Sequence, residues 1–221
     1  MTLQATKTCD PRTSLTRSLL GYGVIAGPVY IVVSLSQALT REGFDLARHQ
    51  WSMLANGGPG WIQVANLTLA ALTTLAFAFG LHRALPSGHG STWAPRLVGV
   101  YALSMAGAAI FPADPAMGFP VGTPEGPGAI SLNGMLHFAC GVVGFAAVAV
   151  ACFILGRRFA VEGRTQWAVY SRVSGALFLV SFAAVAIGAG AVWANLTFVA
   201  GILLIWAWLS VLSLHLYRRA S

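Results

Sequence analysis

The sequence predicts an all-α fold, a polytopic membrane bundle of six transmembrane helices in one domain. Of its 221 residues, 57% are hydrophobic and only 9% are charged, whereas a soluble domain carries about 25% charged residues. The apolar residues gather in six runs, each near the roughly 20 residues that a helix needs to cross the hydrocarbon core. The basic residues cluster between and outside these runs, in alternate connections.

The six runs fill most of the chain. The predicted spans are Leu19–Leu39, Trp61–Leu81, Trp93–Phe111, Leu132–Leu155, Val173–Ala191 and Asn195–Leu216. They leave no room for a soluble domain. We therefore expect a cytoplasmic tail of residues 1–17, one transmembrane domain of residues 18–217 and a second cytoplasmic tail of residues 218–221.

The basic residues predict the orientation of these spans. The formal net charge is +7. Eleven of the 13 basic residues fall on one side of the predicted membrane, namely Lys7, Arg12, Arg17, Arg83, Arg96, Arg157, Arg158, Arg164, Arg172, Arg218 and Arg219. The positive-inside bias makes that side the cytoplasm, so both termini are expected there, in a multi-pass protein of the plasma membrane. Since topology accounts for the charge, no nucleic-acid partner is expected.

Two further features bear on processing and redox state. Met1–Pro11 lacks the apolar core and the cleavage site of a signal peptide, so the first span should remain as an anchor. Cys140 and Cys152 lie on one predicted helix, about 18 Å apart, and Cys9 lies in the N-terminal tail. We expect no disulfide within the chain.

Several side chains in the spans predict how the helices pack. Gly23 and Gly27 form a G-x-x-x-G pair, which lets another helix approach closely, and Pro28 should kink the same helix. Gln63 and Asn66 lie in the first turns of the second span. Their amides either bond across helices or bind a ligand. Trp206, Trp208 and Tyr217, with the terminal arginines, are expected to anchor the last span at the interface.

The first polar stretch on the outer side is Arg41–Trp61. It holds five charged or ionisable side chains within nine positions, Arg41, Glu42, Asp45, Arg48 and His49. We expect a short interfacial helix over Phe44–Leu54, on which Asp45, Arg48, His49 and Ser52 share one face. That face meets either solvent and lipid headgroups or the top of the helix bundle.

The second outer stretch is Phe111–His137, whose many prolines predict an ordered, extended loop. Asp114 precedes Pro115 and is either a placed functional group or the start of a turn. Asn133 and His137 are four residues apart at the start of the fourth span. His137 either lines an outward-opening cavity with Asn133 or is a buried histidine bonded to a backbone carbonyl.

In a chain with so little charge, Asp114 should seek a cation. We therefore expect the two outer loops to pack on each other and to bring Asp114 close to Arg41 or Arg48.

Four short motifs in these regions also occur, in this order, in a known family. They are Leu20-Gly21 to Gly27-Pro28, Trp51-Ser52-Met53-Leu54 to Gly57 with Gly60-Trp61, Phe111-Pro112-Ala113-Asp114-Pro115, and Gly134 to His137. The chain resembles the bacterial integral membrane proteins described as domain of unknown function 998. The resemblance spans nearly the whole chain and implies a helical membrane protein, without an established activity. In that family a histidine is frequent at the position of Asn133, from which this chain departs.

Two classes of function are open on this evidence. As an enzyme, the protein would use Asp45, His49, Asp114 and His137 at the outer mouth for acid/base or hydrolytic chemistry on a lipid or another apolar substrate, with or without a metal ion. The alternative is a protein that binds or transports a lipid or small solute, or an accessory subunit of an envelope complex. In either case the ligand contacts would come from Arg41, Arg48, Ser52, Gln63, Asn66 and Asn133. The cofactor, the metal and the oligomeric state are not specified by the sequence.

Overall fold

The computed structural model describes residues 11–188 and 190–220, which form an all-helical bundle. Its elements are α1 (Pro11–Thr40), the short 3-10 helix η1 (Trp51–Ala55), α2 (Gly60–Ala84), α3 (Trp93–Ile110), α4 (Leu132–Val161), α5 (Thr165–Gly188) and α6 (Val192–Arg219). The described residues contain no β-strand, only an isolated bridge between Ala116 and Phe119. The predicted all-α class is confirmed.

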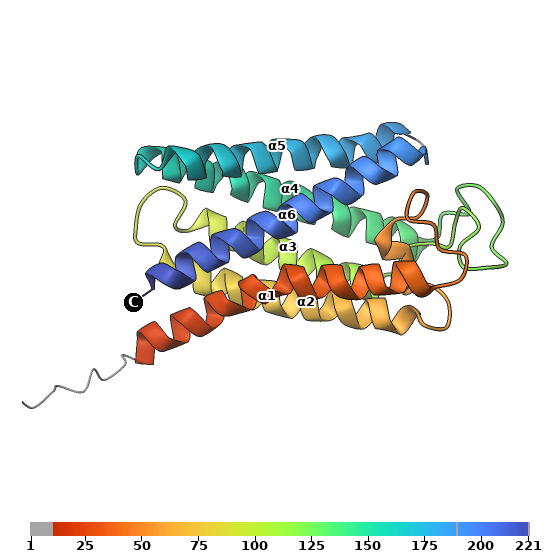
Figure 1. The fold of residues 1–221 in the computed structure, drawn as a ribbon, viewed down its shortest axis with the longest axis horizontal. Helices are drawn as coiled ribbons and strands as arrows, with labels where there is room; N and C mark the ends of the chain where they lie inside the picture. The colour runs from red at the N-terminus through yellow and green to blue at the C-terminus, as the bar shows by residue number, and fades with distance from the viewer. Residues whose placement is uncertain (1–10, 189, 221) are drawn as a thin grey trace, which may run out of the picture.

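The six long helices close into a ring. Each helix packs on its neighbour in the chain, and α6 returns to pack on α1 (Figure 1). One end of the bundle, which we call the loop end, carries residues 41–59, 111–131 and 190–191. The opposite end, the termini end, carries the start of α1, the end of α6 and the connections 85–92 and 162–164.

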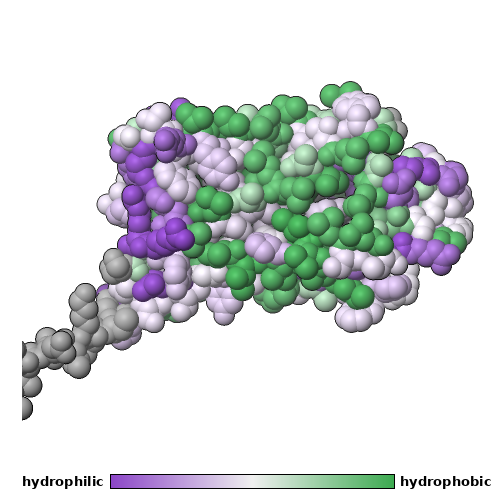
Figure 2. Space-filling view, in the orientation of Figure 1, coloured by the Kyte–Doolittle hydropathy of each residue, from purple (hydrophilic) through white to green (hydrophobic). Residues whose placement is uncertain are grey.

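The surface of the bundle is that of an integral membrane protein. Five helices are long and apolar enough to cross a membrane, α1, α2, α4, α5 and α6. A broad band of hydrophobic side chains lies between hydrophilic patches at the two ends (Figure 2). Lipid tails can cover such a band without leaving backbone groups unpaired, because every spanning segment is helical.

Small residues set the spacing between α1 and its neighbours, as predicted from the G-x-x-x-G pair. A Cβ atom on Gly23 would lie 2.6 Å from the Phe77 ring of α2, and one on Gly27 would lie 2.8 Å from Ser210 Oγ of α6. Either methyl group would force the helices apart. The helix continues through Pro28 from Pro11 to Thr40.

The expectation that Trp206 and Trp208 anchor the chain at the interface is wrong. Their side chains are 1% and 0% exposed. Trp208 Nε1 donates a hydrogen bond to Ser171 Oγ of α5 at 3.1 Å. Both residues lie near the middle of α6, and the N–H of a buried indole usually finds a hydrogen-bond partner, as that of Trp208 does.

The predicted interfacial helix over Phe44–Leu54 is also wrong. Residues 42–48 form turns and extended backbone, and only Trp51–Ala55 is helical, as the single short η1. Asp45 Oδ1 accepts a hydrogen bond from the backbone N–H of Ala47 at 2.8 Å, a turn of the kind that competes with helix formation. As a result, Asp45 is exposed while His49 is buried, so the two do not share a face.

Candidate functional site

The two outer loops pack on each other at the loop end, as expected. His49 is 2% exposed and lies at the centre of this contact. Its Nδ1 accepts a hydrogen bond from the Asp45 backbone N–H at 2.8 Å, and its Nε2 lies 2.9 Å from the carbonyl oxygen of Met117. Because a carbonyl can only accept, Nε2 carries the proton and donates. Both ring nitrogens are thus engaged with backbone groups, which leaves no lone pair on this ring for a substrate.

Arg41 holds the first loop together from inside. Its guanidinium donates hydrogen bonds to the carbonyl oxygens of Leu54 at 2.5 Å and Asn56 at 2.6 Å, and it lies over the ring of Phe119 at 4.8 Å. Partial burial lowers the pKa of Arg41 from its usual value, yet an arginine remains charged at any physiological pH. These contacts place Arg41 as a clamp on the loop backbone.

Arg48 reaches the second loop from the surface. Its Nη2 lies 2.7 Å from a carboxylate oxygen of Glu125, and the two side chains are 39% and 72% exposed. An ion pair this open to water contributes little to stability. The pair therefore links the two outer loops at the rim of their contact, where both side chains meet water.

The expected pairing of Asp114 with Arg41 or Arg48 is wrong. The Asp114 carboxylate accepts hydrogen bonds from Ser131 at the start of α4, from the backbone N–H at 2.8 Å and from Oγ at 2.5 Å. Ser131 Oγ in turn accepts from the Gly134 N–H as the N-cap of α4. The hydrogen bonds from Ser131 lower the pKa of Asp114 from its usual value. A nearby serine at a helix N-terminus supplied a polar partner that the arginines did not.

Gln63 and Asn66 belong to a polar cluster between α1 and α2. Gln63 Oε1 accepts from Gln37 Nε2 at 2.8 Å, and Asn66 Nδ2 donates to Ser34 Oγ at 3.1 Å and to the Tyr30 carbonyl at 3.1 Å. The reading that these amides bond across helices is therefore confirmed. Such pairs hold neighbouring helices in register inside an apolar bundle.

His137 has a different environment from His49. Its Nδ1 lies 2.8 Å from the carbonyl oxygen of Phe111, so Nδ1 carries the proton and donates. The structure gives Nε2 no partner among the described residues. In the neutral ring this nitrogen is a hydrogen-bond acceptor. The half-buried ring therefore keeps one free acceptor site.

His137 lines a cavity of about 150 Å³ in the half of the bundle nearest the loop end. The lining is mostly aromatic and aliphatic and includes Tyr30, Trp51, Leu67, Tyr101, Met105, Phe138, Phe145, Phe182, Val185, Phe198, Val199, Ile202 and Trp206, with Gln50, Ser52 and Ser104 as polar members. Trp51 is 5% exposed, and its Nε1 has no hydrogen-bond partner among the described residues. The lining thus offers an unused acceptor, His137 Nε2, in apolar surroundings.

The residues predicted from the sequence as one site separate into three groups and a single exposed residue, Asn133. Only His137 and Ser52 line this cavity. Asp45, His49, Asp114, Arg41 and Arg48 all bond to the two outer loops or to the start of α4, and Gln63 and Asn66 bond to α1. Asn133 is exposed on the first turn of α4. The described residues contain no group of three His, Cys, Asp or Glu side chains that could hold a metal ion.

Sequence reasoning missed three residues that shape this end. Phe119 is fully buried and packs edge-on against Phe44 with ring centroids 5.0 Å apart. Asn195 donates from α6 to the carbonyl oxygens of Leu46 at 3.0 Å and His49 at 3.3 Å. Trp51 lines the cavity. An aromatic residue inside a proline-rich loop is a sequence signal for a buried loop anchor, and it could have identified Phe119.

Comparison with known proteins gives a family for this arrangement and no activity. No curated protein and no solved structure is detectably similar to the chain. The model of the family described as "Protein of unknown function (DUF998)" matches residues 24–215, a range that includes the ring of helices, both outer loops and the cavity. The chain is therefore a member of the DUF998 family.

Proposed function

We propose that this protein binds a small apolar molecule, or the apolar end of a lipid-like molecule, in the cavity that His137 lines. The observation that carries the proposal is the free Nε2 of His137 in an aromatic lining. A volume of about 150 Å³ matches an apolar protein cavity that accepts benzene. The bound group is therefore one ring, or the tip of one chain, with a hydroxyl or amide N–H that His137 can accept.

Hydrogen bonding would give this site its selectivity. A ligand hydroxyl can donate to the free Nε2 of His137, and one such hydrogen bond contributes about 1 kcal/mol. A ligand that lacks polar atoms would fill the same volume and leave that nitrogen unpaired. A ligand with a single hydroxyl should therefore bind more tightly than its hydrocarbon analogue.

The proposal includes the membrane arrangement. All six long helices cross the plasma membrane, α3 in addition to the five that are long and apolar enough to do so. The termini end lies in the cytoplasm. Support comes from the length of α3, 18 residues, or about 27 Å, and from the positions of α2 and α4, which begin at the loop end and are joined through α3 (Figure 1). Reporter fusions after Gly126 should score as external and those after Glu162 as internal; the reverse at either position would contradict this orientation.

Ligand binding can be tested with two matched probes. We would measure para-fluorophenol and fluorobenzene by fluorine NMR with the purified protein in lipid nanodiscs. Phenol should bind about fivefold more tightly, as one hydrogen bond of about 1 kcal/mol provides. His137→Leu should abolish that preference and leave fluorobenzene binding unchanged, so the hydrocarbon probe reports that the cavity is intact.

A second pair of variants tests the location of the site. A Cβ on Gly141 would meet only the Phe145 ring at 3.7 Å, so Gly141→Leu should fill the cavity and abolish binding of both probes. Gly99→Leu is the matched control, because a Cβ there meets nothing within 4 Å and Gly99 does not line the cavity. Binding of both probes that survives Gly141→Leu would place them elsewhere and overturn the proposal.

Acid/base catalysis on a bound substrate is a second proposal, and it depends on the same histidine. Of the four side chains predicted as catalytic, His137 alone lines the cavity and has an unused nitrogen. A neutral imidazole with Nδ1 held by a carbonyl is oriented to accept a proton at Nε2. Turnover of a hydroxyl-bearing substrate that is lost in His137→Leu, while fluorobenzene still binds, would favour this reading.

A further inference from the structure

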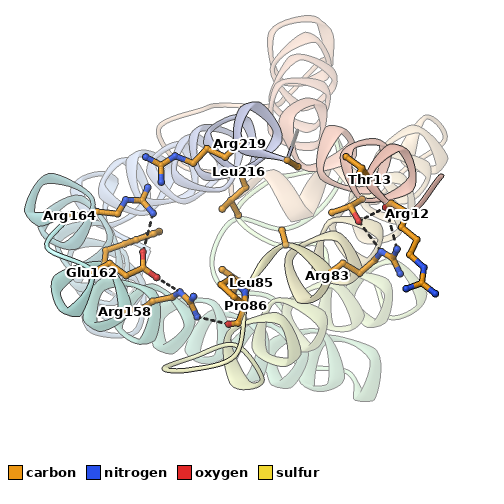
Figure 3. Close-up of a pocket in the computed structure, with 14 residues that line it drawn as sticks. Arg12, Thr13, Arg83, Leu85, Pro86, Arg158, Glu162, Arg164, Leu216 and Arg219 are labelled. Atoms are coloured by element: carbon orange, nitrogen blue, oxygen red, sulfur yellow. Dashed lines mark hydrogen bonds and ion pairs between the residues drawn. The ribbon is translucent and has the colours of Figure 1, made fainter. Parts of the chain in front are cut away.

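A second and larger cavity opens at the termini end. Its volume is about 640 Å³, within the range of ordinary ligand sites. Five arginines contribute to its lining, Arg12, Arg83, Arg158, Arg164 and Arg219, together with a single carboxylate, Glu162. Figure 3 shows Arg158, Glu162 and Arg164 on one wall and Arg83 with Arg12 on the opposite wall. Positive charge therefore surrounds a common space.

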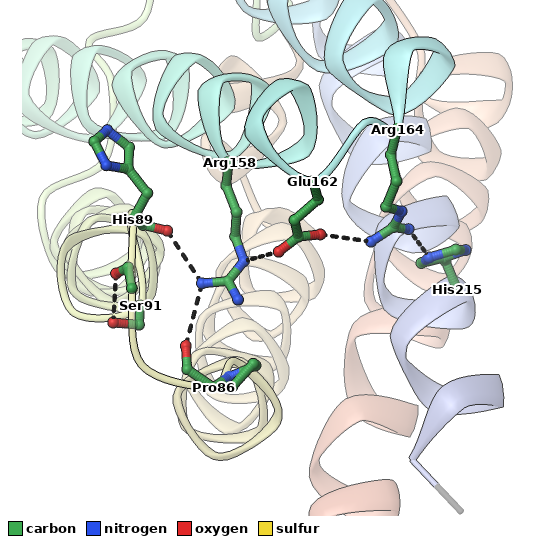
Figure 4. A network of polar contacts seen from close by, with 8 residues as sticks. Pro86, His89, Ser91, Arg158, Glu162, Arg164 and His215 are labelled. Carbon is green, nitrogen blue, oxygen red and sulfur yellow. Dashed lines mark hydrogen bonds and ion pairs between the residues drawn. The ribbon is translucent and has the colours of Figure 1, made fainter.

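A buried network fixes one wall of this cavity. Arg158 is 6% exposed; its Nε lies 2.6 Å from a Glu162 carboxylate oxygen, and its Nη1 donates to the carbonyls of Pro86 at 3.2 Å and His89 at 3.1 Å (Figure 4). The other carboxylate oxygen of Glu162 lies 3.2 Å from Arg164 Nη1. Arg158 thus ties α4 to the connection between α2 and α3, and its charge is largely compensated.

Two of the remaining arginines, Arg83 and Arg219, have no carboxylate partner among the described residues. Glu162 is shared between two guanidinium groups, and Arg164 also contacts the His215 ring nitrogen and lies over the Phe159 ring at 4.5 Å. Arg83 donates to Thr16 Oγ1 and to a backbone carbonyl, both neutral. Arg219 makes no hydrogen bond or ion pair with any residue in the described part of the chain. Among the lining residues that the structure describes, the arginines outnumber the single carboxylate.

Topology alone does not explain this convergence. The positive-inside bias asks only for basic residues near the cytoplasmic ends of spans, and the exposed neighbours Arg157 and Arg218 meet it without lining the cavity. Several guanidinium groups around one space are the usual means of holding a phosphate, because each offers paired N–H donors to its oxygens.

We propose that the cavity at the termini end binds a phosphate-bearing ligand. One wall would contribute Arg164 and Arg219, and the opposite wall Arg83. The same chemistry has two possible sources, the headgroup of an anionic lipid in the adjacent leaflet and a free phosphate or phosphate ester from solution.

The test compares two adjacent arginines of α6. Arg219 lines the cavity and has no protein partner in the described part of the chain, so Arg219→Gln should fold normally; Arg218→Gln removes the same charge from an exposed position outside the lining. We would count phosphatidylglycerol retained by the full chain, by native mass spectrometry in phosphatidylcholine nanodiscs doped with that lipid. Inorganic phosphate binding would be titrated by calorimetry in nanodiscs of phosphatidylcholine alone.

The expected result is a roughly tenfold weaker affinity in Arg219→Gln for whichever probe binds, because one charge-assisted contact is lost, and little change in Arg218→Gln. Retained phosphatidylglycerol without phosphate binding identifies the lipid headgroup, and phosphate binding without lipid identifies the free anion. Equal losses in the two variants would show that anions meet only the diffuse charge of the helix end. That result, or no binding of either probe, overturns the proposal.

Discussion

The two ends of the bundle both concentrate arginine, but they use it in opposite ways. At the loop end, Arg41 is satisfied by two carbonyls of its own loop and Arg48 by Glu125. At the termini end, one glutamate is shared by two arginines, and Arg83 and Arg219 line the same cavity with no carboxylate partner in the described part of the chain. The comparison shows that an arginine in a membrane protein can either satisfy backbone carbonyls or remain available to a ligand. The hydrogen-bond partners of each arginine distinguish the two roles.

The ends differ in their cavities in the same way. The cavity near the loop end is small and apolar, with an unused acceptor on His137. The cavity at the termini end is wide and cationic. Between them lie fully buried apolar side chains, among them Phe77, Phe178 and Leu209. The two proposed sites therefore suit different ligands, an apolar one near the loop end and an anionic one at the termini end. Their linings share no residue, so a substitution can be made in one lining and not in the other.

The largest expected effect is the loss of the buried arginine. Arg158→Met should lower the free energy of unfolding by about 3 kcal/mol, because it leaves one carboxylate oxygen of Glu162 and two carbonyls without their donor. Arg157→Met removes the same charge from the exposed neighbouring position and should change stability by about 0.5 kcal/mol or less. Denaturant unfolding in detergent measures both. Equal effects would show that Arg158 acts only through net charge.

Features that depend on residues close together in the sequence could be predicted, and features that depend on distant residues could not. The approximate positions of the six long helices follow from hydropathy alone, and the Gly23–Gly27 pair and the amides of Gln63 and Asn66 pack as their local pattern indicates. Positions that depend on distant chain segments were missed. Nothing near Arg158 in the sequence indicates the carbonyls of Pro86 and His89 that it binds.

The outer loops show a second reason for failure. Counting three- and four-residue spacings on a presumed helix put Asp45 and His49 on one face, but both bond to backbone groups and so hold the segment in turns. Charge scarcity predicted an arginine for Asp114, whereas a serine N-cap stood closer along the chain's path. Of the candidate site, His137 lines a cavity as its place at the start of an apolar run suggested, and Ser52 lines it too, although the helical face on which it was predicted does not form.

The clamp at the loop end should give the second largest effect. Arg41→Lys keeps the charge but loses the planar fork that reaches two carbonyls at once, so the free energy of unfolding should fall by about 2 kcal/mol. Residues 112–130 should also become more susceptible to protease, since Arg41 lies over the Phe119 ring of that loop. Arg48→Lys, which can still pair with Glu125, is the control. A lysine variant as stable as the parent would mean that Arg41 is not a clamp.

Asp114→Asn should have a smaller effect, with a defined pH dependence. The carboxylate has its pKa lowered by the hydrogen bonds from Ser131, so the stability that it contributes is fully present above the usual pKa of about 4 and is lost as the pH falls toward the lower folded pKa. We expect a loss of about 1 kcal/mol in the variant near neutral pH. The gap between the two proteins should narrow below about pH 4; a constant gap would mean that the charge on Asp114 is irrelevant.

The smallest expected effect is at the rim, and it sharpens the contrast with Arg158. A double-mutant cycle of Arg48→Ala and Glu125→Ala should give a coupling of about 0.5 kcal/mol, because both side chains are open to water. That coupling should fade as salt rises toward about 1 M, where the Debye length is about 3 Å. The Arg158→Met loss should persist in the same salt, since burial shields that network from counterions. If salt erased both effects alike, the arginine at the termini end would be no more structural than the pair at the rim.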